Sequence, residues 1–233
     1  MNCAPFTLLL GVLDGRLVIR PAGVLGAFAV DAKTTEQTLA VLTHMKTAYG
    51  LVSPEEIQEL EDLINDPSAK ELQLQRFFEQ HPQFLRIWDH REVFSQVHLV
   101  REGEGPLIPD FVLLNPDVQR AVVVDLKLPA ARVITRKPNR ERFSALVEEA
   151  RAQLLEYRDW FDQDTNRMRF KKKYGKDVLR PMLGVVIGRQ RDFGSELQRQ
   201  KISSRYDDLQ VVTYDDILRH AQARVGLIET AVR

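Results

Sequence analysis

Residues that could build a covalent or zinc-bound framework are scarce in this sequence. Cys3 is the only cysteine, so the chain can form neither a disulfide framework of its own nor a cysteine-based zinc site. The five histidines show no spacing typical of metal ligands. These scarcities exclude the disulfide-stabilised classes of small protein and the zinc-finger classes.

Long apolar runs are also missing. No run is long enough to cross a bilayer. The short apolar run over residues 6–13 has no Lys or Arg before it, and an Asp-Gly turn follows where a signal peptide would continue. We therefore expect a cytoplasmic protein that does not enter the membrane.

Neither sign of charge is in excess, because 33 Lys and Arg residues balance 33 Asp and Glu residues. Binding to nucleic acid would therefore need a local basic surface. The sequence is 44% hydrophobic and 28% charged, as is usual for a globular protein, and its 233 residues allow one large domain with a small appendage. We predict an N-terminal extension over residues 1–66 and a main domain over residues 67–233.

The predicted extension has the pattern of a hairpin followed by helices. Two strands over residues 7–13 and 16–20 flank an Asp-Gly turn. A helix is predicted over residues 35–47, and a second one begins after Ser53, with Pro54 at its first position.

The main domain has the order helix, three strands, helix, strand. This order predicts an α/β fold whose mixed sheet carries helices on its faces. Residues 162–180 are predicted to form a polar, basic connection. The remaining elements are predicted as a helix over 69–80, strands over 93–100, 108–114 and 121–128, a helix over 140–161, strands over 182–188 and 209–213, and a closing helix over 215–224.

Two acidic residues and a lysine in the central strands are the candidate site. If the strands on either side of a four-residue loop, 116–119, pair as a hairpin, the register places Asp110 directly opposite Asp125. Lys127 lies on the same face as Asp125, because side chains alternate along a strand. The pattern therefore gathers two carboxylates and one ammonium group in one patch.

This patch has the chemistry of a metal-dependent phosphodiesterase. Like charges opposite one another on a sheet are unfavourable, and burial makes them more so, unless a divalent cation offsets them. Mg²⁺, with Mn²⁺ as a substitute, prefers oxygen ligands and can generate hydroxide beside a phosphodiester. Lys127 could orient the water or steady the phosphate. The alternative is a surface hairpin with solvated acids.

Two helices offer further candidates. Glu71 lies on one helical stripe with Leu74 and Phe78, so it could reach the metal, but it could also close a capping box with Ser68. On the long helix, Gln153 could reach the metal-bound water or a phosphate, and Tyr157 could contact a nucleic-acid backbone. The alternative for this pair is a packing edge with Tyr157 in the core.

The order of these motifs resembles that of the Shedu anti-phage immune nucleases, a branch of the PD-(D/E)xK superfamily. The resemblance covers the middle and C-terminal part of the chain. The matching pieces are Glu71-Leu72-Gln73, Phe78-Glu79-Gln80-His81-Pro82, Ile108-Pro109-Asp110-Phe111, Val124-Asp125-Leu126-Lys127-Leu128-Pro129 and Gln153-Leu154-Leu155-Glu156-Tyr157.

The resemblance implies a restriction-endonuclease-like core of order αβββαβ, cleavage of DNA with Mg²⁺, and a role in defence against phage. It implies that Asp110 and Asp125 are metal ligands and that Lys127 is the catalytic lysine. It also implies that Glu71 and Gln153 support the site, and we assign Glu71 to the metal ligands. We expect a homo-oligomer, and no small-molecule cofactor.

Two basic clusters are candidates for phosphate binding. The first follows the catalytic strand directly, and the second lies in the predicted connection; either could instead be a solvated surface. Their members assigned to nucleic acid are Arg132, Arg136, Lys137 and Arg140 in the first, and Lys171, Lys172 and Lys173 in the second.

We therefore predict a metal-dependent DNA endonuclease. The alternatives from the sequence are a nucleic-acid-binding or sensing module that kept the fold without efficient catalysis, and a phosphodiesterase that acts on RNA.

Overall fold

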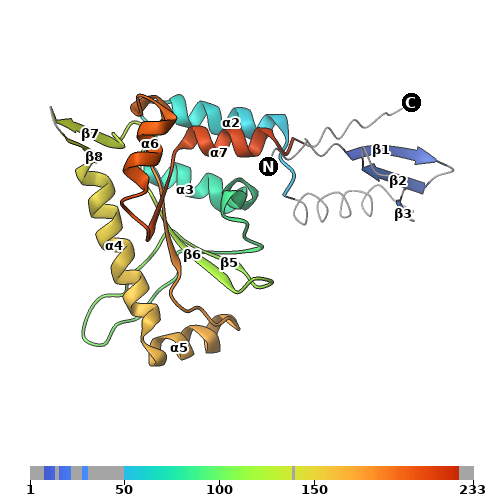
Figure 1. Cartoon of the computed structure of the whole chain (residues 1–233). Helices are drawn as coiled ribbons and strands as arrows, with labels where there is room; N and C mark the ends of the chain where they lie inside the picture. The colour runs from blue at the N-terminus through green and yellow to red at the C-terminus, as the bar shows by residue number, and fades with distance from the viewer. Residues whose placement is uncertain (1–7, 14–15, 22–27, 31–49, 138–139, 226–233) are drawn as a thin grey trace. The chain divides into compact units, whose positions relative to one another are not determined.

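The computed structural model describes residues 8–13, 16–21, 28–30, 50–137 and 140–225 (Figure 1). By its internal contacts the chain divides into two compact units, Met1–Glu61 with Leu218–Arg233, and Asp62–Ile217. The predicted boundary at residue 66 stays a prediction. Among the described residues, none of the helices is long and apolar enough to span a membrane.

The first unit contains a small antiparallel sheet of order β1-β2-β3. The predicted hairpin is confirmed as β1 (Leu8–Leu13) and β2 (Arg16–Pro21), and β3 (Phe28–Val30) pairs with β2. The predicted helix over 35–47 lies outside the described residues.

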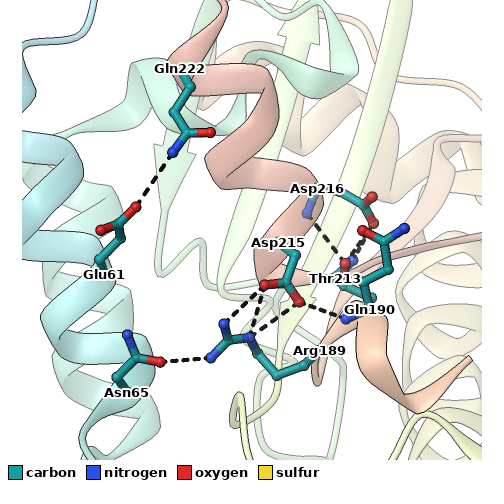
Figure 2. A network of polar contacts seen from close by, with 8 residues as sticks. All are labelled: Glu61, Asn65, Arg189, Gln190, Thr213, Asp215, Asp216 and Gln222. Atoms are coloured by element: carbon teal, nitrogen blue, oxygen red, sulfur yellow. Dashed lines mark hydrogen bonds and ion pairs between the residues drawn. The ribbon is translucent and has the colours of Figure 1, made fainter.

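Helix α2 (Pro54–Asn65) begins in the first unit. The predicted start after Ser53 is confirmed, and Ser53 caps the helix: the Ser53 N–H donates to Glu56 Oε2 at 2.9 Å, and the Glu56 N–H donates to Ser53 Oγ at 3.3 Å. Glu61, further along this helix, accepts a hydrogen bond through Oε1 from Gln222 Nε2 at 3.4 Å (Figure 2).

The second unit is organised by a mixed five-stranded sheet of order β10-β9-β6-β5-β4. Strands β4, β5 and β6 are antiparallel neighbours, whereas β9 runs parallel to both β6 and β10. The bounds are β4 (Glu92–Ser95), β5 (Phe111–Asn115), β6 (Arg120–Leu126), β9 (Met182–Val186) and β10 (Leu209–Val212). The strands predicted over 108–114, 121–128, 182–188 and 209–213 are thus confirmed, with ends that differ by up to three residues.

Helices flank this sheet as predicted. Helix α3 (Glu71–Gln80) contacts β6, and α4 (Ala145–Asp162) contacts β6 and β9. A 3₁₀ helix, η1 (Pro82–Trp88), follows α3, and α7 (Tyr214–Gln222) is the predicted closing helix. The predicted restriction-endonuclease-like order αβββαβ is therefore present, with β10 added at the sheet edge (Figure 1).

The main core lies between the sheet and α4. It gathers alternate residues of the strands, such as Val112, Val123 and Val185, against Leu154 and Phe161 of the helix. Asp125 and Lys127 follow Val123 at intervals of two, so alternation directs them toward the α4 side of the sheet.

The prediction of a helix beginning at residue 140 is wrong, because a second hairpin precedes the long helix. It consists of β7 (Ile134–Lys137) and β8 (Arg140–Phe143). Its first pair, Ile134 opposite Phe143, is buried, so packing of these two side chains decides for strand over helix. Ser144 then caps α4 by accepting a hydrogen bond from the Val147 N–H at 3.4 Å.

Two helices were not predicted from the sequence. Residues 164–174, expected to be part of a connection, form α5 (Asp164–Tyr174), which ends at Gly175 in the left-handed conformation with three lysines in its last turn. Glycine at this position and cations at a helix C-terminus both stabilise the helix. Helix α6 (Glu196–Ser203) is capped by Ser195, which accepts from the Gln198 N–H at 3.1 Å.

The strand predicted over residues 93–100 ends early. Gln96 has a φ of 49°, which interrupts the extended backbone after β4. Beyond it, only an isolated bridge pairs Leu99 with Leu107.

Gly188, which follows β9, occupies a position that no other residue fits. Its φ is 63°, and a Cβ there would lie 2.4 Å from Val133 Cγ2 and 2.5 Å from the Ala131 carbonyl oxygen. We expect Gly188→Ala to lower the free energy of unfolding by about 3 kcal/mol or more, because backbone strain and overpacking add. Urea unfolding of the purified protein measures this.

Gly175→Ala is the matched control. Gly175 has a φ of 71°, but nothing lies within 4 Å of its added Cβ, so only the backbone strain remains. We expect a loss of about 1 kcal/mol. Equal losses for the two variants would contradict the close approach at Gly188.

Candidate active site

The register that was predicted from the loop length places the two acidic residues. Strands β5 and β6 pair from Asn115 opposite Arg120 to Phe111 opposite Val124, as expected. Asp110 lies one residue before β5, and its Oδ2 accepts a hydrogen bond from the Leu126 N–H at 2.7 Å. Just beyond the paired residues, the Asp110 side chain is thus bound to the backbone of β6.

Asp125 and Lys127 form an ion pair at the end of β6, in which Lys127 Nζ lies 2.8 Å from Asp125 Oδ2. Asp125 is 5% exposed. Apart from this ion pair, no hydrogen-bond donor in the described part of the chain reaches the buried Oδ2. The buried Asp125 and the half-buried Asp110 therefore share the charge of one lysine.

Burial, together with the nearby Asp125 and Glu71 carboxylates, raises the pKa of Asp110 to about 6, although the Leu126 N–H and Lys127 oppose the shift. Burial also raises the pKa of Asp125, against the opposing hydrogen bond and charge of Lys127. Both carboxylates are therefore less stable as anions than free carboxylates, so a further cation would be favoured beside them.

Lys127 stays protonated in this environment. Burial alone would lower the pKa of its ammonium group, but the hydrogen bond and charge of Asp125, with the charges of Glu71 and Asp110, outweigh it, so the pKa is raised. An ammonium group with a raised pKa can donate hydrogen bonds to a phosphate or a water, but it is a poor base at neutral pH.

The capping alternative for Glu71 is wrong. Ser68 donates through both its N–H and its hydroxyl to Asp66 Oδ1, and the residue before the helix is Lys70, whose N–H donates to Gln73 Oε1 at 2.8 Å. Glu71 is the first residue of α3 and its side chain is exposed, whereas Leu74 and Phe78 are buried. Its charge nevertheless acts on Asp110, Asp125 and Lys127.

Gln153 and Tyr157 form a hydrogen-bonded pair on α4, in which Gln153 Nε2 donates to the Tyr157 hydroxyl. That hydroxyl donates in turn to the Ile108 carbonyl oxygen at 3.4 Å, two residues before Asp110. Tyr157 is 2% exposed, so its ring packs in the core, as the alternative reading expected. Its contact with a nucleic-acid backbone stays a prediction that this burial does not favour.

The first basic cluster follows β6. Arg132 is exposed, and Arg136, Lys137 and Arg140 belong to the β7–β8 hairpin. The side chains of Arg136, Lys137 and Arg140 lie outside the part of the molecule that the structure describes.

The second basic cluster, Lys171, Lys172 and Lys173, lies in the last turn of α5. Lys171 Nζ lies 3.2 Å from Asp177 Oδ2. Lys171 lines a hollow of about 620 Å³ together with Arg120, which lies at the start of β6. Asp125 comes five residues later in that strand, which places the hollow at roughly 15 Å or more from the site.

Sequence reasoning missed one residue that contacts the site. The Tyr214 hydroxyl donates to the Lys127 carbonyl oxygen at 2.7 Å, from a position that is fully buried. A buried tyrosine needs a hydrogen-bond partner. However, the sequence carries no signal that this partner lies 87 residues away.

The site fits a hard divalent cation in part. In the described residues, no group of three His, Cys, Asp or Glu side chains could hold a metal ion by itself. Asp110 and Asp125 nevertheless supply two carboxylates with raised pKa values. Mg²⁺ is commonly held by one or two carboxylates, with water and substrate phosphate as the other ligands. This donor set is therefore compatible with Mg²⁺ or Mn²⁺.

Comparison with known proteins gives one finding. The family model described as Shedu protein SduA, C-terminal, matches residues 68–218. This segment contains Glu71, Asp110, Asp125, Lys127 and Gln153, and it excludes the whole of the predicted N-terminal extension, residues 1–66. A search of curated proteins finds no match.

The raised pKa of Asp110 gives stability a pH dependence. The folded state binds this proton more tightly than the unfolded chain does, so its contribution to stability is present below about pH 4 and is lost as the pH rises through about 6. Asn at this position can still accept from the Leu126 N–H but carries no charge. We expect Asp110→Asn to raise the free energy of unfolding by about 2 kcal/mol near pH 7.5 without metal, and to change it little near pH 4.

Urea unfolding at the two pH values measures the effect, and Asp117→Asn is the control because Asp117 is exposed. A stability difference that does not change with pH would show that Asp110 is not held at a raised pKa.

Proposed function

We propose that this chain, which belongs to the Shedu family of anti-phage defence proteins, is a metal-dependent DNA endonuclease. The proposal is supported mainly by one observation: a buried carboxyl group, a half-buried one and a protonated lysine converge at the site end of β5 and β6. The cytoplasmic location and homo-oligomeric state expected from the sequence belong to the same proposal.

Asp110 and Asp125 would hold a Mg²⁺ ion through their carboxylates. Such an ion supplies a hydroxide near neutral pH and offsets the charge that develops on a phosphodiester during hydrolysis. The Leu126 N–H orients Asp110 by binding one of its oxygens, so that the carboxylate is in place before substrate arrives.

Lys127 contributes as a cation rather than as a base. Its ammonium group is held at Asp125 by the 2.8 Å ion pair and has two further protons to donate. It can therefore orient the attacking water or bind a phosphate oxygen, but a proton acceptor must come from elsewhere. Its location also keeps positive charge beside the two carboxylates before the substrate binds.

Glu71 and Gln153 would support this arrangement from two helices. Glu71 adds negative charge at the start of α3, which strengthens the site's attraction for cations. Whether it also ligates the metal directly stays a prediction. Gln153 donates to Tyr157, which in turn holds the Ile108 carbonyl oxygen two residues before Asp110. The Gln153 amide is exposed, so it could also bind a phosphate.

A second candidate function is binding of nucleic acid without efficient catalysis. The observation that favours it is that no third acidic or histidine ligand completes a metal-holding group in the described residues. An RNA-directed phosphodiesterase would use the same groups, so it differs only in substrate.

The test is cleavage of supercoiled plasmid DNA and of a matched RNA duplex with and without Mg²⁺. We expect Mg²⁺-dependent nicking of DNA by the wild type and a loss of at least about 100-fold in Lys127→Ala, because a cation that acts in the transition state is removed. Lys201→Ala, an exposed lysine of α6, is the control and should retain activity.

Calorimetric titration with Mn²⁺ separates metal binding from cleavage. We expect the wild type to bind Mn²⁺ and Asp125→Ala to lose this binding. Metal binding without cleavage would favour the second candidate, and equal binding by both proteins would exclude Asp125 as a ligand.

Glu71→Gln tests the supporting charge on α3. The change keeps the shape of the side chain and removes one negative charge, so the fold should persist while the turnover number falls by about 10-fold, equivalent to about 1.4 kcal/mol of barrier. Glu79→Gln is the control, since Glu79 is an exposed carboxylate on the same helix that interacts with Gln75. Wild-type turnover in Glu71→Gln would remove Glu71 from the site.

A further inference from the structure

Both backbone groups of Lys127 are held from elsewhere in the fold. The Lys127 N–H donates to the Val186 carbonyl oxygen of β9 at 2.8 Å, which continues the parallel pairing of β6 and β9. Its carbonyl oxygen lies beyond the end of the ladder and accepts from the Tyr214 hydroxyl at 2.7 Å. Tyr214 therefore supplies a hydrogen bond to the Lys127 carbonyl oxygen, which no neighbouring strand among the described residues reaches.

The ring of Tyr214 joins this contact to the opposite helix. It stacks on Phe78 of α3, with ring centroids 6.4 Å apart and planes 21° apart. Phe78 is fully buried, two turns after Glu71 at the start of that helix. The same side chain thus contacts the strand end that carries Lys127 and the helix that begins with Glu71.

The backbone of Tyr214 is tied to the same strand end through Gly188. The Tyr214 N–H donates to the Gly188 carbonyl oxygen at 3.2 Å, and the Gly188 N–H donates to the Leu128 carbonyl oxygen at 3.2 Å. A side chain at Gly188 would collide with the Ala131 backbone, so glycine permits this close approach.

The residue after Tyr214 is anchored as firmly (Figure 2). Asp215 accepts from Arg189 Nε at 3.0 Å and Arg189 Nη2 at 2.9 Å, and its Oδ2 accepts from the Gln190 N–H at 2.6 Å. Arg189 also donates through Nη1 to Asn65 Oδ1 at 2.9 Å. The start of α7 is therefore fixed against the loop that follows β9.

We propose that Tyr214 is a positioning residue, whose hydroxyl fixes the backbone of Lys127 and thereby keeps the ammonium group at the Asp125 carboxylate. The proposal rests on the proposed nuclease function for its effect on catalysis. A phenylalanine would fill the same volume and stack on Phe78 equally well, so packing alone does not require the hydroxyl. Its proton has one acceptor, the Lys127 carbonyl oxygen.

The experiment compares Tyr214→Phe with the wild type. We expect the turnover number on plasmid DNA to fall by about 10-fold with KM changed by less than about 2-fold, because an interaction that matters only in the transition state is weakened. Mn²⁺ affinity should stay within about 2-fold, since both carboxylates remain. In metal-free protein, hydrogen exchange at the amides of residues 126–130 should become faster.

Trp160→Phe is the matched control. Trp160 is also a buried aromatic residue, and its Nε1–H donates to a main-chain carbonyl, that of Val100, at 2.9 Å. This variant loses a comparable hydrogen bond and more packing volume, so it should lose stability while turnover and the exchange of residues 126–130 stay at wild-type values.

The outcomes separate the two proposals. Equal effects of Tyr214→Phe and Trp160→Phe on exchange and turnover would reduce Tyr214 to a structural role and overturn the inference. If the wild type cleaves no nucleic acid, the proposed function fails. Unchanged exchange at residues 126–130 in Tyr214→Phe would then overturn the positioning contact as well, whereas faster exchange would uphold it.

Discussion

The ion pair between Lys127 and Asp125 is the interaction on which the candidate site depends. Without it, the buried Asp125 and the half-buried Asp110 would lie at the end of the sheet with no counter-charge, and such an arrangement is strongly unfavourable. One lysine does not neutralise two carboxylates, and burial, with the charges of neighbouring carboxylates, raises the pKa of both Asp110 and Asp125 despite Lys127. The site is therefore built with a deficit of positive charge, and this deficit is what a divalent cation would fill.

The surrounding fold keeps this unfavourable cluster from rearranging. If its backbone were not held, Lys127 could turn its side chain to solvent and leave Asp125, because the residue follows the last paired position of β6. Three contacts oppose this: the β9 backbone at its N–H, Tyr214 at its carbonyl oxygen, and the approach of Gly188 to Leu128. The glycine-only conformation at Gly188 and the buried side chain of Tyr214 thus lie beside the group that they stabilise.

The parts of the site that could be predicted from sequence are those set by local geometry. A four-residue loop determines the register of β5 and β6, and alternation then places Lys127 beside Asp125. Packing between distant segments could not be predicted in this way. The residue pattern of 140–143 suits a helix and a strand equally, and only the burial of Phe143 against Ile134 decides.

The same distinction explains two further errors. Ser68 and Glu71 have the spacing of a capping box. However, the N–H and the hydroxyl of Ser68 both donate to Asp66, and the helix begins at Glu71 instead of residue 69. The Glu71 carboxylate is therefore not used in a cap at Ser68. The contact of Tyr214 with Lys127 joins α7 to the end of β6, and no local pattern connects them. Composition, spacing and periodicity describe neighbours along the chain, whereas these contacts depend on which elements meet in the folded unit.

The two basic clusters differ in how well they could serve such a site. The chain has no net charge, so attraction for phosphate must come from cations close to the carboxylates. Arg132 follows β6 within five residues of Lys127 and is exposed. Lys171 instead lies with Arg120 at the other end of β6, and its ammonium group is paired with Asp177.

A bound duplex would extend past both ends of one strand, since a span of 15 Å covers less than half a helical turn of DNA. The second cluster could therefore contact a flanking phosphate, but screening over that distance would leave it little influence on the scissile one. We accordingly expect the residues after β6 to set the affinity at the site, and those of α5 to add only to the length of DNA that is bound.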